Sequence, residues 1–158
     1  MDYREILNDL IEINNDRIAG YEKAAALSHE EDLLRTFNSM ADQSRGFVKA
    51  LDETVKSAGA EAATGTTLRG KVYRTWMDIK SSFGGDDRKS ILESCEYGED
   101  AAKEAYKEAL TEEFPAEIEA MIRQQYDLLV QSHDKIHAMR DLAPTDEKRP
   151  TDIRRNSL

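Results

Sequence analysis

The stretch GAEAATGTTLRG (residues 59–70) decides the fold, because it separates two pairs of long helical segments. It contains three glycines, and its composition is typical of a loop. The segments on either side have apolar residues at alternating spacings of three and four, the pattern of helices that bury one face. The sequence therefore predicts an all-α chain with an unusually long central connection.

Two long helices are predicted before this loop. The inner stripe of the first is Leu7, Ile11, Asn14, Ile18, Tyr21 and Ala25. That of the second is Leu33, Phe37, Met40, Ser44, Phe47 or Val48, Leu51, Val55 and Ala58. Between them, Ser28 to Glu31 fits a capping box, in which Ser28 caps the second helix and Glu31 bonds back. Helices joined so tightly are antiparallel neighbours.

Three further helices follow the loop. A short one carries Val72, Trp76, Ile79 and Phe83 on one face. The next is capped by Asp86 or Asp87 and has an inner stripe of Leu92, Cys95, Glu99, Ala102 and Tyr106. The last starts near Pro115, and its inner face is Ile118, Ile122, Gln125, Leu129, Ser132, Ile136 and Met139.

The length of the central connection predicts the topology. A helix of about 27 residues is roughly 40 Å long, and residues 59–86, with a helix worth roughly 21 Å, can run back over that length. Short, long and short connections then give a ferritin-like four-helix bundle, whose crossover carries the short extra helix. We assign the bundle to residues 1–142 and predict a disordered polar tail over 143–158.

Composition and charge exclude several classes of function. The net charge is −10, and residues 143–158 carry four basic and three acidic side chains, so the remainder is at −11. Such a surface repels nucleic acids and anionic membranes, and we predict neither as a partner. The single cysteine forms no internal disulfide, no apolar run reaches bilayer length, and the first residues do not resemble a signal peptide. We therefore expect a soluble, cytoplasmic protein.

Four polar residues interrupt the apolar stripes at one height of the bundle. They are Asn14, Ser44, Glu99 and Gln125, one from each long helix. A buried carboxylate needs hydrogen-bond donors, and the other three residues have them. We favour a buried hydrogen-bond network that fixes the register of the helices.

A metal site is the alternative. Glu22, Glu96 and His133 lie at the margins of their stripes, and with Glu99 they could close around one Fe, Mn or Zn ion. Bundles that bind two irons have Glu-x-x-His on two helices, and neither the second nor the last helix contains that motif. The sequence thus argues against a complete di-iron centre.

Five segments of the chain carry a resemblance: GYEKAA (20–25), residues 43–47, YRTWMDIK (73–80), ILESCEYGEDAAKEAY (91–106) and QYDLLVQSHDKI (125–136). In this order they resemble an uncharacterised bacterial family of ferritin-like four-helix-bundle proteins with a domain of unknown function. The resemblance covers residues 5–142 and implies the ferritin-like fold without an established activity. Where that family often has His-Arg and Gln-Arg, this chain has Tyr73-Arg74 and Gln43-Ser44.

The resulting hypothesis is a non-catalytic bundle that binds at most one metal ion, with a stress-related role by analogy to ferritin-like proteins. The alternatives are a metal-dependent oxidoreductase or iron-handling protein with an incomplete centre, and a helical interaction module. A strip of Tyr126, Val130 and His133 lies outside the main stripe of its helix. We expect the helix of Trp76 to cover this strip; otherwise it is the surface of a homodimer.

Overall fold

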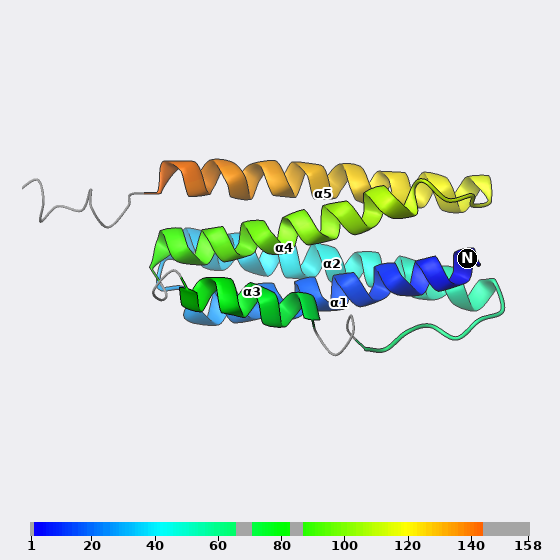
Figure 1. The fold of residues 1–158 in the computed structure, drawn as a ribbon, viewed down its shortest axis with the longest axis horizontal. Coiled ribbons are helices and arrows are strands. Elements are labelled where there is room, and N and C mark those ends of the chain that lie inside the picture. The colour runs from blue at the N-terminus through cyan, green and yellow to red at the C-terminus, as the bar shows by residue number, and fades with distance from the viewer. Residues whose placement is uncertain (1, 66–70, 83–86, 144–158) are drawn as a thin grey trace, which may run out of the picture.

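A computed structural model describes residues 2–65, 71–82 and 87–143. Within these ranges the chain forms five helices and no strand, so the prediction of an all-α chain is confirmed (Figure 1). The helices are α1 (Tyr3–Leu27), α2 (Glu31–Ser57), α3 (Lys71–Ser82), α4 (Arg88–Ala109) and α5 (Ala116–Leu142). None of those described helices has the length and apolar character that crossing a membrane requires. Apart from Ala143, the tail predicted over 143–158 lies outside the described residues, as does Phe83.

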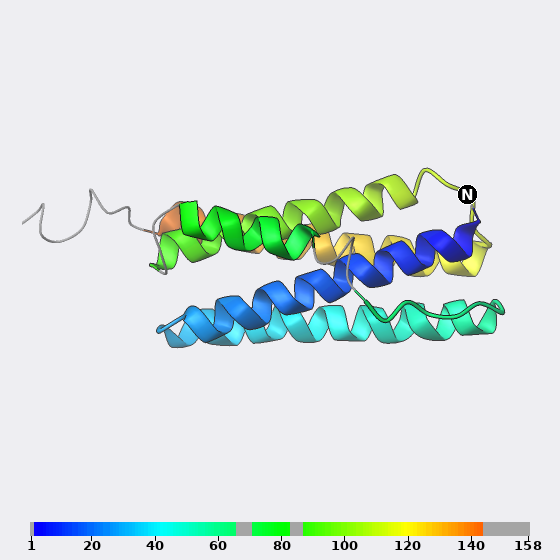
Figure 2. The ribbon, with the colours of Figure 1, turned by 60° about the horizontal axis from the view of Figure 1, so that its bottom comes forward.

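The four long helices pack side by side, in the order α1, α2, α5, α4 around the bundle. Short turns join α1 to α2 and α4 to α5, and each of these pairs is antiparallel (Figure 1). The connection between α2 and α4 is long, and these two helices run in the same direction (Figures 1 and 2). The short helix α3 belongs to this connection and packs on α1 and α4.

The first part of the long connection runs along α1 and is held there by two asparagines. The side chain of Asn8 donates to the carbonyl of Glu61 (3.0 Å) and accepts from the backbone of Ala63 (2.8 Å). Two turns further along α1, Asn15 donates to the carbonyl of Gly65 (2.8 Å). Three backbone polar groups of the connection, one each from Glu61, Ala63 and Gly65, are therefore satisfied by α1.

Of the two predicted N-terminal caps, one is confirmed and the other is wrong. Asp87 caps α4, because its Oδ1 accepts from the backbone N–H of Ser90 (3.1 Å). The capping box is wrong: Ser28 ends α1 instead, and its hydroxyl donates to the carbonyl of Ala24 (2.7 Å). The cap residue of α2 is Glu30, whose side chain makes no capping hydrogen bond.

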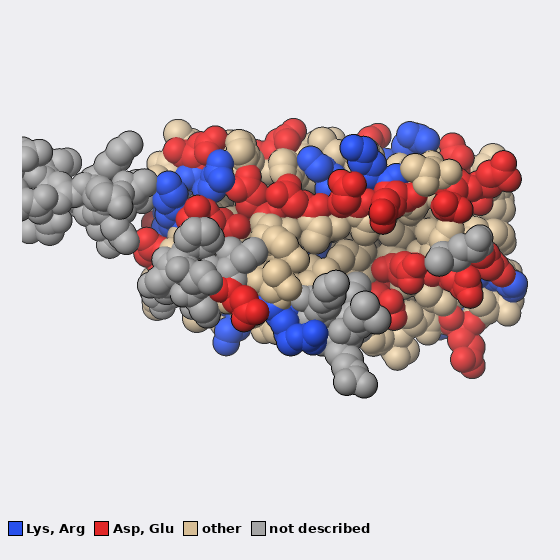
Figure 3. Space-filling view, viewed as in Figure 1, with Lys and Arg blue, Asp and Glu red and all other residues tan. Residues whose placement is uncertain are grey.

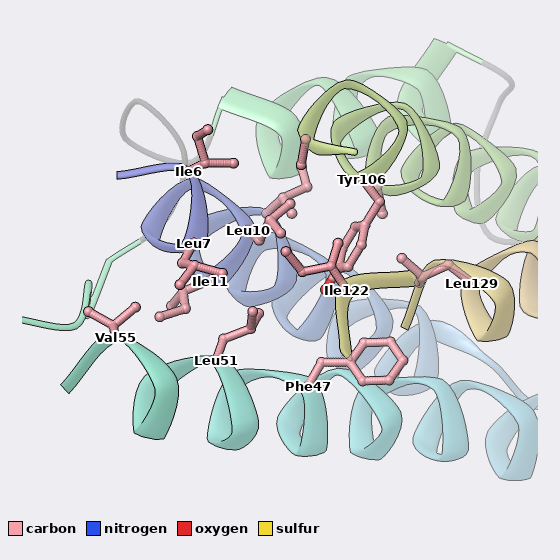
Figure 4. Close-up of a cluster of buried hydrophobic side chains, with 13 residues drawn as sticks. Ile6, Leu7, Leu10, Ile11, Phe47, Leu51, Val55, Tyr106, Ile122 and Leu129 are labelled. Carbon is pink, nitrogen blue, oxygen red and sulfur yellow. The ribbon is translucent and has the colours of Figure 1, made fainter. Parts of the chain in front are cut away.

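The apolar core has two clusters along the bundle. Figure 4 shows the first, in which side chains of α1, α2, α4 and α5 interdigitate around Leu10, Leu51 and Ile122. The second surrounds Tyr21, Phe37 and Trp76. Asn14, Ser44 and Glu99 come between the two clusters in α1, α2 and α4, whereas Gln125 lies within the first cluster, between Ile122 and Leu129 of α5.

Trp76 is wholly buried, in a slot that two glycines form between α1 and α4. A Cβ atom at Gly20 or at Gly98 would lie within 3.0 Å of the indole ring, closer than real Cβ atoms approach. The indole also meets the ring of Tyr21 edge-on, with centroids 5.2 Å apart. The glycines are therefore required by packing, although glycine costs about 1 kcal/mol relative to alanine inside a helix.

This packing corrects two sequence interpretations. The helix of Trp76 does not cover the strip on the last helix, because α3 contacts α1 and α4 and not α5. Tyr126, Val130 and His133 are each partly buried. Ile18, predicted on the inner stripe of α1, is only half-buried, while Arg17 beside it is buried. The buried face of α1 is wider than a single stripe because α2, α4 and α3 all pack against it.

Candidate functional site

A buried ion pair lies at the centre of the bundle. Arg17 of α1 donates to Glu99 of α4 through Nη2 (2.7 Å) and through Nε (3.0 Å), both to the same oxygen, Oε2. The two side chains are 1% and 0% exposed, which shields the pair from solvent. The hydroxyl of Tyr21 also donates to this oxygen, and the guanidinium carbon lies 5.3 Å from the centre of the Tyr21 ring.

The guanidinium of Arg17 links this pair to the second helix. Its Nη1 donates to the hydroxyl of Ser44 (2.7 Å) and to the carbonyl of Met40 (3.3 Å). Ser44 in turn donates to Oδ1 of Asn14 (2.8 Å). Arg17, Ser44 and Asn14 are thus paired along this path, as low-dielectric surroundings demand of buried groups. The second oxygen of Glu99, Oε1, is buried without a hydrogen-bond partner among the described residues.

From Asn14 the network continues to the last helix. Its Nδ2 donates to the hydroxyl of Tyr106 (2.8 Å) and to the carbonyl of Leu10 (2.8 Å). Tyr106 then donates to Oε1 of Gln125 (2.6 Å). One continuous set of hydrogen bonds thus joins Glu99 to Gln125 and includes side chains of all four long helices.

The four residues predicted for a polar layer all belong to this network. Asn14, Ser44, Glu99 and Gln125 are each at most 5% exposed. The sequence reasoning missed Arg17, which connects three of the helices. A signal was present, because Arg17 follows Asn14 by three residues and precedes Tyr21 by four, and so shares their face of the helix.

Within this site Arg17 is positively charged, and the phenol groups of Tyr21 and Tyr106 are neutral. Burial alone would lower the pKa of Arg17, but the negative charge of Glu99 raises it above its ordinary value. Burial and the neighbouring Glu99 raise the pKa of Tyr21 well above 10.0. Burial likewise raises the pKa of Tyr106. Both tyrosines therefore act as hydrogen-bond donors throughout the physiological range.

Cys95 lies one turn before Glu99 on α4 and is wholly buried. Burial and the charge of Glu99 raise the pKa of its thiol well above 9.0. Since the thiolate is the nucleophile, this cysteine is unsuited to nucleophilic or redox chemistry in the folded chain.

The structure does not bring together the four residues of the predicted metal set. Glu99 faces Arg17 in the core, whereas Glu22 is exposed and pairs with Arg45 of α2. Among the residues that the structure describes, no group of three or more histidines, cysteines or carboxylates is arranged to hold a metal ion.

The other two members of the set, Glu96 and His133, are partly buried where α4 meets α5. Nε2 of His133 is 2.6 Å from Oδ1 of Asp100. One turn away, His137 contacts Glu96 through Nδ1, and Arg140 is 2.8 Å from the same carboxylate group. The two imidazole rings stack with centroids 6.1 Å apart. Each imidazole therefore has a carboxylate of the neighbouring helix as its partner.

The pKa of His137 is expected to lie above its ordinary value. The hydrogen bond with Glu96 and the charge of Asp141, 3.2 Å from Nε2, raise the pKa of His137 above 6.5. Because the folded state favours the protonated ring, the resulting stabilisation is present below pH 6.5 and is lost as pH rises through the raised folded pKa. An NMR titration of the imidazole checks this: Glu96→Gln should move the midpoint of His137 down. An unchanged midpoint would contradict the assignment.

The fold and the buried network define an all-α protein whose core is crossed by an ion-paired polar layer. Residues 2–112 match the family described as "Domain of unknown function (DUF2383)", and the chain belongs to that family. The matched range includes Arg17, Ser44 and Glu99, and it ends before α5, which supplies Gln125. No curated protein matches the chain.

Proposed function

We propose that this chain is a non-catalytic bundle of the ferritin-like arrangement, whose core is closed by an internal ion pair in place of a metal centre. The order of connections supports this arrangement, since a long crossover joins two antiparallel pairs. In ferritin-like di-iron proteins, inward carboxylates and histidines bind the metal. Here the buried polar side chains among the described residues are two carboxylates, one guanidinium, two amides and six serine or threonine hydroxyls, and no histidine is among them.

The observation that carries the proposal is the position of Arg17. A buried carboxylate requires a counter-ion or a proton. Arg17 supplies that positive charge from within the chain, at 2.7 Å from Oε2 of Glu99. A guanidinium remains protonated throughout the biological pH range. Glu99 is therefore neutralised without a metal ion.

Metal analysis tests the proposal against its rival, a metal-dependent oxidoreductase or iron-handling protein that uses Glu22, Glu96, Glu99 or His133. Protein purified without chelator is measured for Fe, Mn and Zn, and is measured again after anaerobic incubation with Fe(II). We expect no stoichiometric metal in either sample. Stoichiometric metal that disappears in Glu99→Gln or in His133→Gln, with helical content unchanged, would overturn the proposal in favour of the rival.

A helical interaction module is the second candidate, and one observation favours it. The groove between α1 and α4 is filled by α3 over one half and is open over the other. An open, partly apolar groove between helices is a surface on which another helix can pack.

A further inference from the structure

The open half of the groove between α1 and α4 has an apolar floor. Ile6 and Leu10 of α1 face Ala105 and Ala109 of α4 across a depression of about 330 Å³. In Figure 3 it follows the neutral strip between two rows of acidic side chains, beyond the end of α3. The small alanine side chains leave the space into which a larger apolar side chain could pack.

The rim of this groove is negatively charged. Asp9, Glu108 and Glu112 line it together with Thr111, and neither lysine nor arginine is among its described lining residues. Partial burial and the nearby Glu5 raise the pKa of Asp9 above its ordinary value, as expected of a carboxylate with acidic neighbours. The groove thus combines an apolar floor with an acidic edge, and its complement is an apolar surface flanked by positive charge.

The chain itself shows what kind of segment packs between α1 and α4. The sequence of α3 contains three basic residues and one acidic residue, and its tryptophan fills the slot at Gly98. Ala105 follows Gly98 by seven residues, which is about two turns or roughly 10 Å along α4. The open groove therefore continues the surface that already accepts a basic helix with a large apolar side chain.

We propose that this groove binds a basic amphipathic helix of a partner protein. The apolar side chains of that helix would pack against the partly exposed Ala105, at the opening above the buried Leu10 and Ala109. Its lysines or arginines would pair with Asp9, Glu108 and Glu112. This inference is independent of the proposed role of the core, because it uses none of the side chains that form the buried network. The expected partner is a helix that has one apolar ridge with basic residues on both sides of it.

The probe is a fluorescein-labelled helical peptide of leucine and lysine with a single apolar face, titrated in an anisotropy assay. Two variants test the two components of the groove: Asp9→Asn/Glu108→Gln/Glu112→Gln removes the charge, and Ala105→Phe fills the floor without changing any charge. The matched control, Glu53→Gln/Glu117→Gln/Asp127→Asn, removes three exposed carboxylates from α2 and α5. Thermal unfolding establishes that each variant is folded.

We expect the charge variant to weaken binding roughly tenfold, because three exposed ion pairs, each of modest strength, are lost together. Ala105→Phe should weaken it by a similar factor, and the matched control by much less. Equal weakening by the matched control would show diffuse attraction to an acidic surface and overturn the proposal. So would the absence of peptide binding, or a dimer in sedimentation velocity that Ala105→Phe dissociates, which would assign the groove to a second copy of the chain.

Discussion

Arg17→Met is expected to lower the free energy of unfolding by about 3–5 kcal/mol. The substitution removes the only guanidinium that contacts Glu99 among the described residues, and it leaves a carboxylate that is 0% exposed. An uncompensated buried charge costs far more than the lost hydrogen bonds. Urea unfolding followed by circular dichroism measures the change, because the midpoint and slope together give the free energy.

The double variant Arg17→Met/Glu99→Leu is the control for this prediction. Replacing both members of a buried ion pair by apolar residues of similar volume is often neutral or stabilising. We therefore expect the double variant to recover much of the stability that Arg17→Met loses. If the single variant loses less than about 1 kcal/mol, Glu99 does not depend on Arg17 for its charge, and the closed-core proposal is contradicted.

The same residues show what the sequence could and could not predict about the site. Asn14, Ser44, Glu99 and Gln125 were placed at one height by counting residues from the two short turns, since helix rise and period are fixed. Arg17 was missed although it shares the face of Asn14 and Tyr21, because an arginine is normally exposed. Its burial depends on α4 bringing Glu99 against α1, which is a long-range contact that the local pattern does not encode.

The fold, like the site, could be predicted only in part from the sequence. Apolar periodicity was sufficient for the long helices, and the length of the connection was sufficient for its return along the bundle. The contact of α3 was predicted incorrectly, because periodicity shows that Trp76 is buried but not by which helices. The information was present in Gly20 and Gly98, which are unfavourable inside helices and are explained only by the indole ring between them.

The second large expected effect concerns the slot that Gly20 and Gly98 form around the indole of Trp76. Gly98→Ala is expected to destabilise the chain by about 1–3 kcal/mol, because the new Cβ atom would overlap the indole of Trp76 and force it to shift. Helix propensity opposes the change, since alanine is favoured over glycine by about 1 kcal/mol in a helix. Gly46→Ala in α2 is the matched control: its Cβ would meet nothing within 4 Å, so propensity alone should stabilise that variant.

Trp76→Ala tests whether the clash with the indole causes the destabilisation by Gly98→Ala. On its own this substitution should cost about 3–5 kcal/mol, because it empties a slot that buries the whole indole. In that background the ring that Gly98 accommodates is gone, so Gly98→Ala should become neutral or stabilising by up to about 1 kcal/mol. The sign of one substitution would thus reverse with the presence of the other, which is a coupling that only direct contact between the two residues explains. If Gly98→Ala remains destabilising without the indole, the glycine serves the backbone of α4, and the docking of α3 does not depend on it.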